Sequence, residues 1–234
     1  QGRKPDKQKE KRITALFQPK GMQLLFILLT DKEAVNDTIR TLAKKANISN
    51  DRAFAVMKEL KEKGFILETG KRENQLINIK SLLEKWLVNY GDRLRPKLFL
   101  GDYKVSPALI DSLEDELNVA FGEQVKTYAF GGSIGADILT GYYRGSSAEI
   151  FIKPDILEEV RTTLKLLPAR EANLTLFNLF SPKLIYGKTK INYPVVHPLF
   201  IYAELLYNGG GRELDTAKRI YNEYLKQDFD GSEA

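Results

Sequence analysis

The N-terminal part of the chain alternates apolar and polar positions with the spacing of α-helices. Residues 19–30 are almost continuously apolar and predict a buried helix that ends at Thr30. A second helix is predicted over residues 37–46, because apolar side chains recur there at i, i+3, i+4 and i+7, and Asp37 is placed to cap its N-terminus. The apolar positions of this second helix are Ile39, Leu42, Ala43 and Ala46.

A short turn, residues 47–49, separates this helix from a third predicted helix over residues 50–63. Asn47 is of the residue type that, after glycine, most often takes the left-handed conformation at the end of a helix. Ile48 is predicted to be the buried residue of the turn, and Ser49 can cap the helix that follows. The turn chemistry therefore predicts two helices meeting across a tight corner.

Two short strands are predicted after Gly64, which ends the third helix. They cover residues 65–69 and 75–79, and a charged turn over residues 70–74 joins them. Two helices across a short turn, followed by a hairpin with a basic tip, form the pattern of a winged helix–turn–helix. We therefore expect a winged helix–turn–helix DNA-binding domain over residues 13–90.

The rest of the chain mixes helical and extended patterns without a repeat or a low-complexity tract. The predicted helices cover residues 81–90, 107–121, 135–142, 154–166, 198–207 and 213–225. The predicted strands cover residues 97–100, 148–152 and 173–180. We expect Trp86 in the core, a connector over residues 91–100, and a mixed α/β domain over residues 101–234, so the predicted fold class is α+β.

The composition removes several kinds of chemistry. The chain has 234 residues, no cysteine and a single histidine, so disulfides, zinc fingers, thiol nucleophiles and most catalytic zinc sites are excluded. His197 precedes Pro198 at a helix start, where we expect it to cap or pack. The longest apolar run, Leu24 to Leu29, is far too short to cross a membrane. We expect a cytoplasmic, nucleoid-associated protein without metal, cofactor or membrane contact.

The charge is distributed unevenly along the chain. The first 90 residues carry 19 basic and 11 acidic side chains, and the remaining residues carry 17 basic and 20 acidic ones. Residues 1–12 are expected to be a basic tail or linker, left either by an upstream domain or by a processed terminus. This asymmetry indicates that the N-terminal part contacts a polyanion, while a basic lobe that is only solvated remains the alternative.

The predicted winged helix–turn–helix suggests roles for its polar and basic residues. The third helix would enter the major groove, where Asn50 and Arg52 can bond to bases, and Phe54 could touch a thymine methyl. Phosphate contacts are expected from the second helix, and phosphate or minor-groove contacts from the hairpin tip. The candidate DNA-binding residues are Thr38, Arg40, Lys44, Lys45, Ser49, Asn50, Asp51, Arg52, Phe54, Ala55, Lys58, Lys71 and Arg72.

One segment of the second domain resembles the outline of the nucleotidyltransferase fold. Residues 130–133, Phe-Gly-Gly-Ser, precede a predicted helix and then a strand that carries Glu149. Active members of that fold place two carboxylates at i and i+2 on such a strand to bind two metal ions. Here the neighbouring positions are Ser147 and Phe151, so we predict no catalytic residue. The domain is then either a degenerate relative that keeps the shape, or the likeness is accidental.

Several segments together resemble the AbiEi family of type IV antitoxin transcriptional regulators, over about residues 11–225. The helix–turn–helix part of the resemblance, Ile39 to Phe65, is generic. The more specific segments are Leu83 to Tyr90, Leu94 to Leu98, Leu139 to Tyr143 and His197 to Leu206.

The resemblance implies a DNA-binding autorepressor of a toxin–antitoxin or phage-defence operon, acting on an operator that is an inverted repeat. Its functional counterpart would be a nucleotidyltransferase toxin, which the antitoxin opposes without necessarily contacting it. From the residues themselves, an enzyme of the nucleotidyltransferase class and a non-catalytic protein-interaction module remain the alternatives.

Overall fold

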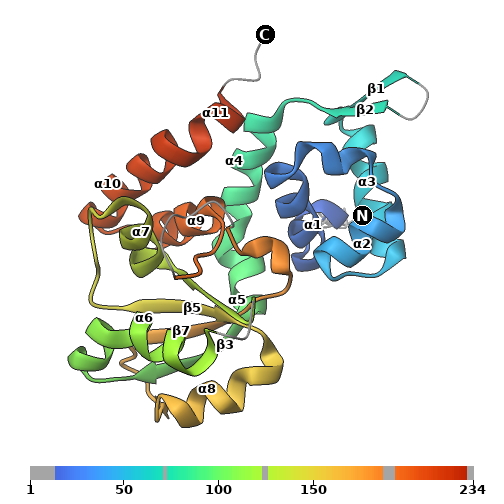
Figure 1. Ribbon diagram of the computed structural model, residues 1–234. Helices are drawn as coiled ribbons and strands as arrows, with labels where there is room; N and C mark the ends of the chain where they lie inside the picture. The colour runs from blue at the N-terminus through green and yellow to red at the C-terminus, as the bar shows by residue number, and fades with distance from the viewer. Residues whose placement is uncertain (1–13, 71–72, 123–125, 187–192, 231–234) are drawn as a thin grey trace, which may run out of the picture.

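The computed structural model describes residues 14–70, 73–122, 126–186 and 193–230. It has an N-terminal lobe of helices and a hairpin (residues 14–76), a long linking helix (residues 79–98) and a C-terminal lobe built on a sheet (residues 99–230) (Figure 1). The expected tail over residues 1–12 lies outside the described residues. Helices and sheets together agree with the predicted α+β class.

The N-terminal lobe contains the helices and the hairpin in the expected order. Its elements are η1 (Ala15–Phe17), α1 (Pro19–Thr30), η2 (Lys32–Asn36), α2 (Ile39–Ala46), α3 (Asn50–Glu62), β1 (Ile66–Gly70) and β2 (Glu73–Leu76). Strands β1 and β2 pair antiparallel, with Ile66 opposite Leu76. The second strand ends at Leu76, three residues before the predicted end at residue 79, because α4 begins at Ile79.

The corner between α2 and α3 follows the predicted turn chemistry. Asn47 is left-handed, with φ 53° and ψ 54°, and the Ser49 hydroxyl accepts a hydrogen bond from the Arg52 N–H at 3.3 Å. Ile48 is half-buried and packs against the core. The N-cap of α2 was predicted wrongly: Thr38, not Asp37, accepts the hydrogen bond, from the Thr41 N–H at 3.2 Å. Asp37 instead pairs with Lys45.

The predicted connector over residues 91–100 is instead helical for most of its length. Helix α4 (Ile79–Asn89) continues through a π-helical turn, η3 (Tyr90–Leu94), into α5 (Arg95–Leu98), so the first strand of the sheet begins only at Phe99. Tyr90, Leu94 and Leu98 are buried along this linking helix. It is therefore a packed part of the core rather than an exposed linker.

The C-terminal lobe is a five-stranded mixed sheet with the strand order β4-β5-β7-β3-β6. The strands are β3 (Phe99–Lys104), β4 (Tyr128–Gly131), β5 (Ala148–Ile152), β6 (Leu167–Pro168) and β7 (Leu174–Asn178). Strands β5 and β7 are parallel, and the other pairs are antiparallel. The sequence pattern had predicted neither β4 nor β6.

Helices flank this sheet on both sides. They are α6 (Pro107–Phe121), α7 (Gly132–Thr140), η4 (Pro154–Ile156), α8 (Leu157–Thr163), η5 (Pro182–Leu184), α9 (Pro198–Asn208), α10 (Gly211–Ile220), η6 (Tyr221–Leu225) and α11 (Lys226–Phe229). In Figure 1, α7, α9 and α10 stack above the sheet, and α8 lies below it. No helix among the described residues is long and apolar enough to cross a membrane.

The two lobes share one continuous core centred on the Phe200 ring of α9. Five aromatic rings surround it at centroid distances of 4.8 to 6.1 Å. They belong to Phe26, Trp86, Tyr90, Phe151 and Phe180, and so come from the N-terminal lobe, the linking helix and the C-terminal lobe. The indole of Trp86 also donates to the Met22 carbonyl at 3.0 Å, as expected for a core residue. The lobes are therefore packed against each other through buried aromatic side chains.

Candidate nucleic-acid interface

Helix α3 presents a mostly polar outer face. Its buried side is formed by Ala53, Val56, Met57 and Leu60. The exposed side carries Asn50, Asp51, Phe54 and Lys58, which follow one another at helical spacing. Arg52 and Ala55 are only half-exposed, at the edge of this face. Of the residues predicted on this helix, Asn50, Asp51, Phe54 and Lys58 are thus accessible to a bound molecule.

Helix α2 adds two cationic side chains, Arg40 in its first turn and Lys44 in its last turn. Arg40 and Lys44 are exposed, and no carboxylate among the described residues pairs with either of them. Thr38 caps the helix, and its hydroxyl lies 3.0 Å from the Thr41 hydroxyl. Exposed Arg and Lys side chains of this kind are typical contacts for phosphate oxygens.

Lys45, which was predicted to contact phosphate, has two carboxylate partners in the structure. Its ammonium lies 2.6 Å from Asp37 and 3.1 Å from Asp31, and its side chain is only 23% exposed. Burial alone lowers the pKa of Lys45, but the hydrogen bonds to Asp37 and Asp31 outweigh it, so the pKa is raised. The Ser181 hydroxyl donates to the Lys45 carbonyl at 2.6 Å, which ties this residue to the C-terminal lobe.

Lys20 was not predicted as a site residue, yet it lies beside the corner. Its exposed ammonium donates to the Asn47 carbonyl at 3.2 Å. Lys20 is the one charged residue in the otherwise uncharged run from Pro19 to Thr30, and that contrast is the sequence signal that could have identified it. The fold brings it next to α2 and α3, the two helices that carry the other candidates.

The β1–β2 hairpin is anchored to the lobe by an asparagine. The Asn36 amide donates to the Asn74 carbonyl at 3.0 Å, and the Asn74 N–H donates back to the Asn36 side chain at 2.7 Å. The hairpin projects away from the C-terminal lobe (Figure 1). Its predicted tip residues, Lys71 and Arg72, lie outside the described residues.

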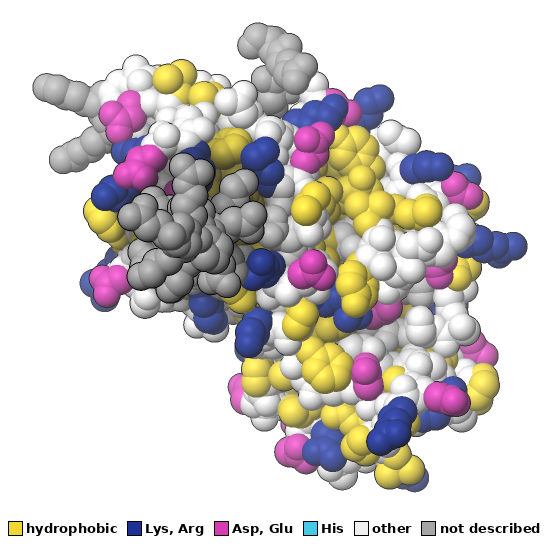
Figure 2. Space-filling view, turned by 180° about the vertical axis from the view of Figure 1, so that it is seen from behind, with side chains coloured by type: hydrophobic (Ala, Val, Ile, Leu, Met, Phe, Trp, Pro, Cys, Tyr) yellow, Lys and Arg dark blue, Asp and Glu magenta, His cyan; other side chains and the backbone are white. Residues whose placement is uncertain are grey.

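Charges of both signs lie on the face of the C-terminal lobe that Figure 2 shows. In Figure 2 its Lys and Arg side chains are interspersed with Asp and Glu side chains. Arg144 is held by a two-pronged ion pair with Glu114 and also donates to the Ile110 carbonyl at 2.8 Å. The His197 imidazole caps α9 by accepting from the Leu199 N–H at 3.2 Å, which confirms its predicted capping role.

Glu149 of β5 is buried rather than presented to a ligand. It is 5% exposed, and one of its oxygens accepts from the Asn208 amide at 3.3 Å. Burial, and then repulsion from Glu204, raise the pKa of Glu149 to about 7, against the opposing effects of Asn208, Arg95 and the Ser133 N–H. Among the described residues no group of three or more His, Asp or Glu side chains could hold a metal ion.

Glu204 forms a second buried carboxylate close to the first. It pairs with the Arg95 guanidinium at 3.0 Å and accepts a hydrogen bond from the Tyr90 hydroxyl. Burial raises the pKa of Glu204 above its ordinary value, although Arg95 and Tyr90 act in the opposite direction. Arg95 also lies over the ring of Tyr207, 4.3 Å from its centroid. This network joins the linking helix to α9.

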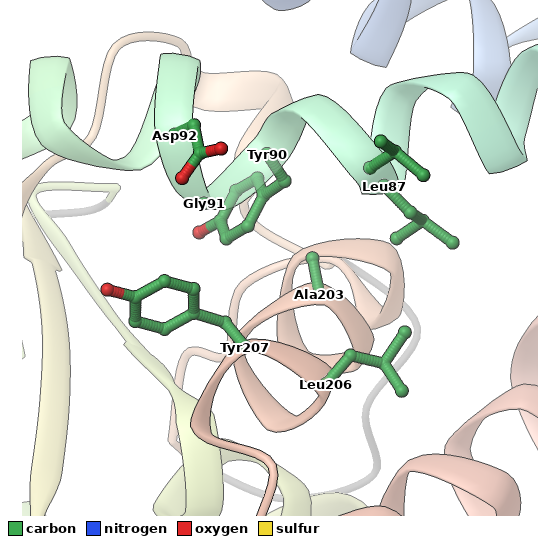
Figure 3. A pocket seen from close by; sticks show the side chains of 8 residues that line it. Leu87, Tyr90, Gly91, Asp92, Ala203, Leu206 and Tyr207 are labelled. Carbon is green, nitrogen blue, oxygen red and sulfur yellow. The ribbon is translucent and has the colours of Figure 1, made fainter.

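A groove of about 220 Å³ runs along the same junction between α4 and α9 (Figure 3). Leu87 and Tyr90 line one side, and Ala203 and Leu206 line the other. The Tyr207 ring packs so closely on Gly91 that a Cβ there would lie 2.6 Å from the ring. Asp92 and Tyr207 add polar groups to the lining, beside these apolar side chains.

Comparison with known proteins places the chain in a family. The family model for a transcriptional regulator, the AbiEi antitoxin of a type IV toxin–antitoxin system, matches residues 75–226. The match covers the linking helix and nearly all of the C-terminal lobe, and it leaves α1, α2 and α3 outside, whereas the sequence resemblance was expected to begin near residue 11. No curated protein and no solved structure matches the chain. Because the match spans more than half of its length, the chain belongs to the AbiEi antitoxin family of transcriptional regulators.

Proposed function

We propose that this regulator is a DNA-binding autorepressor whose N-terminal lobe is a winged helix–turn–helix. The observation that carries the proposal is the outer face of α3, where Asn50, Phe54 and Lys58 are exposed beside the unpaired cations of α2. The β1–β2 hairpin projects from the N-terminal lobe away from the C-terminal lobe (Figure 1). A duplex can therefore reach the hairpin without meeting the sheet domain.

In this proposal α3 enters the major groove with its N-terminal turn toward the base edges. Asn50 can make two hydrogen bonds to an adenine, while Lys20, Arg40 and Lys44 bind phosphates on either side. Lys71 and Arg72 in the hairpin would reach phosphates or the minor groove. Lys45 is left out, because Asp31 and Asp37 already neutralise it.

The number of phosphate contacts sets the salt dependence of binding. Five cations are assigned to phosphates in the proposed interface, namely Lys20, Arg40, Lys44, Lys71 and Arg72, whereas Lys58 lies 3.7 Å from the Glu62 carboxylate. Each phosphate contact releases counterions, so log K is expected to fall with log salt at a slope of roughly −4 to −5. An operator built as an inverted repeat would bind two copies of the chain.

The test is fluorescence anisotropy with DNA from upstream of the chain's own gene, at several salt concentrations. The double variant Arg40→Ala, Lys44→Ala should flatten the slope by about two. Lys218→Ala is the control, since Lys218 is also an exposed cation but lies on α10 of the C-terminal lobe, where it pairs with Asp215. Salt-independent binding, or equal slopes for the double variant and the control, would contradict the proposal.

The same proposal separates repression from toxin neutralisation. The family describes an antitoxin of a type IV system, and we propose a nucleotidyltransferase toxin as its counterpart, opposed without required contact. Asn50→Ala should weaken operator binding about 5- to 150-fold, typical for one lost base contact. The variant should still rescue growth under toxin expression. A reporter assay beside a growth assay measures both, and joint loss of both in a folded variant would contradict the separation.

We also propose that the C-terminal lobe works without catalysis, in the cytoplasm. Glu149 is the only carboxylate on strand β5, without a second one at i+2 or i−2, and it is buried under Gly132 and hydrogen-bonded by Asn208. One buried carboxylate cannot clamp two metal ions. Incubation with labelled nucleotides, Mg²⁺ or Mn²⁺, and RNA or DNA acceptors tests this. Label transfer that disappears in Glu149→Ala would overturn it.

A further inference from the structure

The outer face of α3 carries one large apolar side chain in a polar surrounding. Phe54 is 60% exposed, and among the described residues no aromatic ring or cation stacks on it. Its neighbours on the same face, one helical turn before and after, are Asn50 and Lys58. The ring is not part of the core of the lobe, which Val56 and Leu60 fill from the opposite side of the helix.

A phenyl ring can recognise only a small set of groups in the major groove. It neither donates nor accepts a hydrogen bond, so against the amino or carbonyl edge of a base it would leave polar atoms unpaired. The one apolar group exposed in that groove is the methyl on C5 of a pyrimidine, which thymine carries and which 5-methylcytosine shares. The half-exposed Ala55 lies at the edge of the face and is too short to replace the ring.

We infer that Phe54 reads the 5-methyl group of a pyrimidine in each operator half-site. The inference rests on the proposed function, in which α3 lies in the major groove, and it adds the chemical group that the site selects. Burying one methyl group is worth about a fourfold change in affinity. Removing that methyl group should therefore weaken binding by about fourfold for each half-site.

The experiment replaces each thymine of the operator in turn by uracil, which removes the methyl and leaves every hydrogen-bonding group in place. Binding of the full chain to these duplexes is measured by anisotropy for the natural sequence, for Phe54→Ala and for Val119→Ala. Val119 is the control because it is an 87% exposed apolar residue on a helix of the C-terminal lobe. Two further duplexes carry cytosine or 5-methylcytosine at the sensitive position.

The expected result is one sensitive thymine in each half-site for the natural sequence and for Val119→Ala, and none for Phe54→Ala. The 5-methylcytosine duplex should bind more tightly than the cytosine duplex if the methyl group itself is read. Equal affinity for every uracil duplex would overturn the inference, and so would unchanged sensitivity in Phe54→Ala. Failure of the proposed function looks different, because the natural operator would then bind no better than a scrambled duplex.

Discussion

Replacing the buried carboxyl group of Glu149 by an amide should change the pH dependence of stability. The side chain lies on a central strand of the sheet, under the left-handed Gly132, where an added Cβ would lie 1.9 Å from a carboxylate oxygen. Glu204 is the nearest buried acid acting on it, and Asn208 and the Ser133 N–H stabilise its charge only in part. In Glu149→Gln an amide oxygen remains to accept from these groups, and the charge is gone at every pH.

The sign of the effect follows from proton binding. The pKa of Glu149 is about 7 in the folded protein, against an ordinary value of 4.5. Below pH 4.5 both the folded and the unfolded chain hold the proton, and the carboxyl costs no stability. As the pH rises toward 7 the unfolded chain loses the proton first, so the free energy of unfolding falls. Above pH 7 the cost reaches its full size of about 3 kcal/mol.

The free energy of unfolding of Glu149→Gln should therefore exceed that of the natural sequence by about 3 kcal/mol more at pH 8 than at pH 4.5. This corresponds to roughly 6–12 °C in Tm. Urea unfolding at a series of pH values measures the difference, and any constant packing effect of the amide cancels between them. Glu116→Gln is the control, since Glu116 is exposed on α6. A difference between Glu149→Gln and the natural sequence that stays constant from pH 4.5 to 8 would refute the reasoning.

Three further substitutions test what individual hydrogen bonds and ion pairs contribute to stability, one in the C-terminal lobe and two in the N-terminal lobe. Arg144→Ala leaves the Glu114 carboxylate without its two-pronged partner and should cost about 2 kcal/mol in urea unfolding, and an unchanged midpoint would contradict that. Asn36→Ala removes the acceptor of the Asn74 N–H, whose hydrogen exchange should become about fivefold faster while amides of the sheet keep their rates. Thr38→Ala should lose about 1 kcal/mol of stability, and Thr38→Asp, which restores a cap, should retain it.

Elements whose signals are local could be predicted from the sequence. The helices Pro19–Thr30 and Pro107–Phe121 and the strand Ala148–Ile152 have the predicted bounds, because caps, proline at a helix start and the apolar pattern act within a few residues. The helix over residues 81–90 was predicted to give way to a connector over residues 91–100, which contains Gly91 and Pro96, two residues that ordinarily interrupt helices. In the structure the first makes room for the Tyr207 ring, and the second stands in the first turn of α5, where proline is tolerated.

The candidate interface depended more on contacts distant in sequence. Both Asp37 and Thr38 are good N-caps, and the choice between them follows from Lys45, which draws Asp37 into an ion pair. The same pairing removes Lys45 from the accessible cations. Lys20 joins them only because α1 begins beside the corner at Asn47. Periodicity identifies which face of a helix is polar, but it does not show which charges on that face are already paired.

The aromatic rings around Phe200 come from both lobes, so the chain cannot be cut between the lobes into two pieces that each keep an intact core. A break ahead of α4 would expose the ring of Phe26 on one piece and the rings of Trp86 and Phe200 on the other. Recombination between related genes would meet the same obstacle. A helical lobe from one relative can pack on the sheet lobe of another only if the aromatic side chains on both sides of this contact come from the same relative. The two halves of the protein are therefore expected to be inherited together, and their aromatic positions to change in concert.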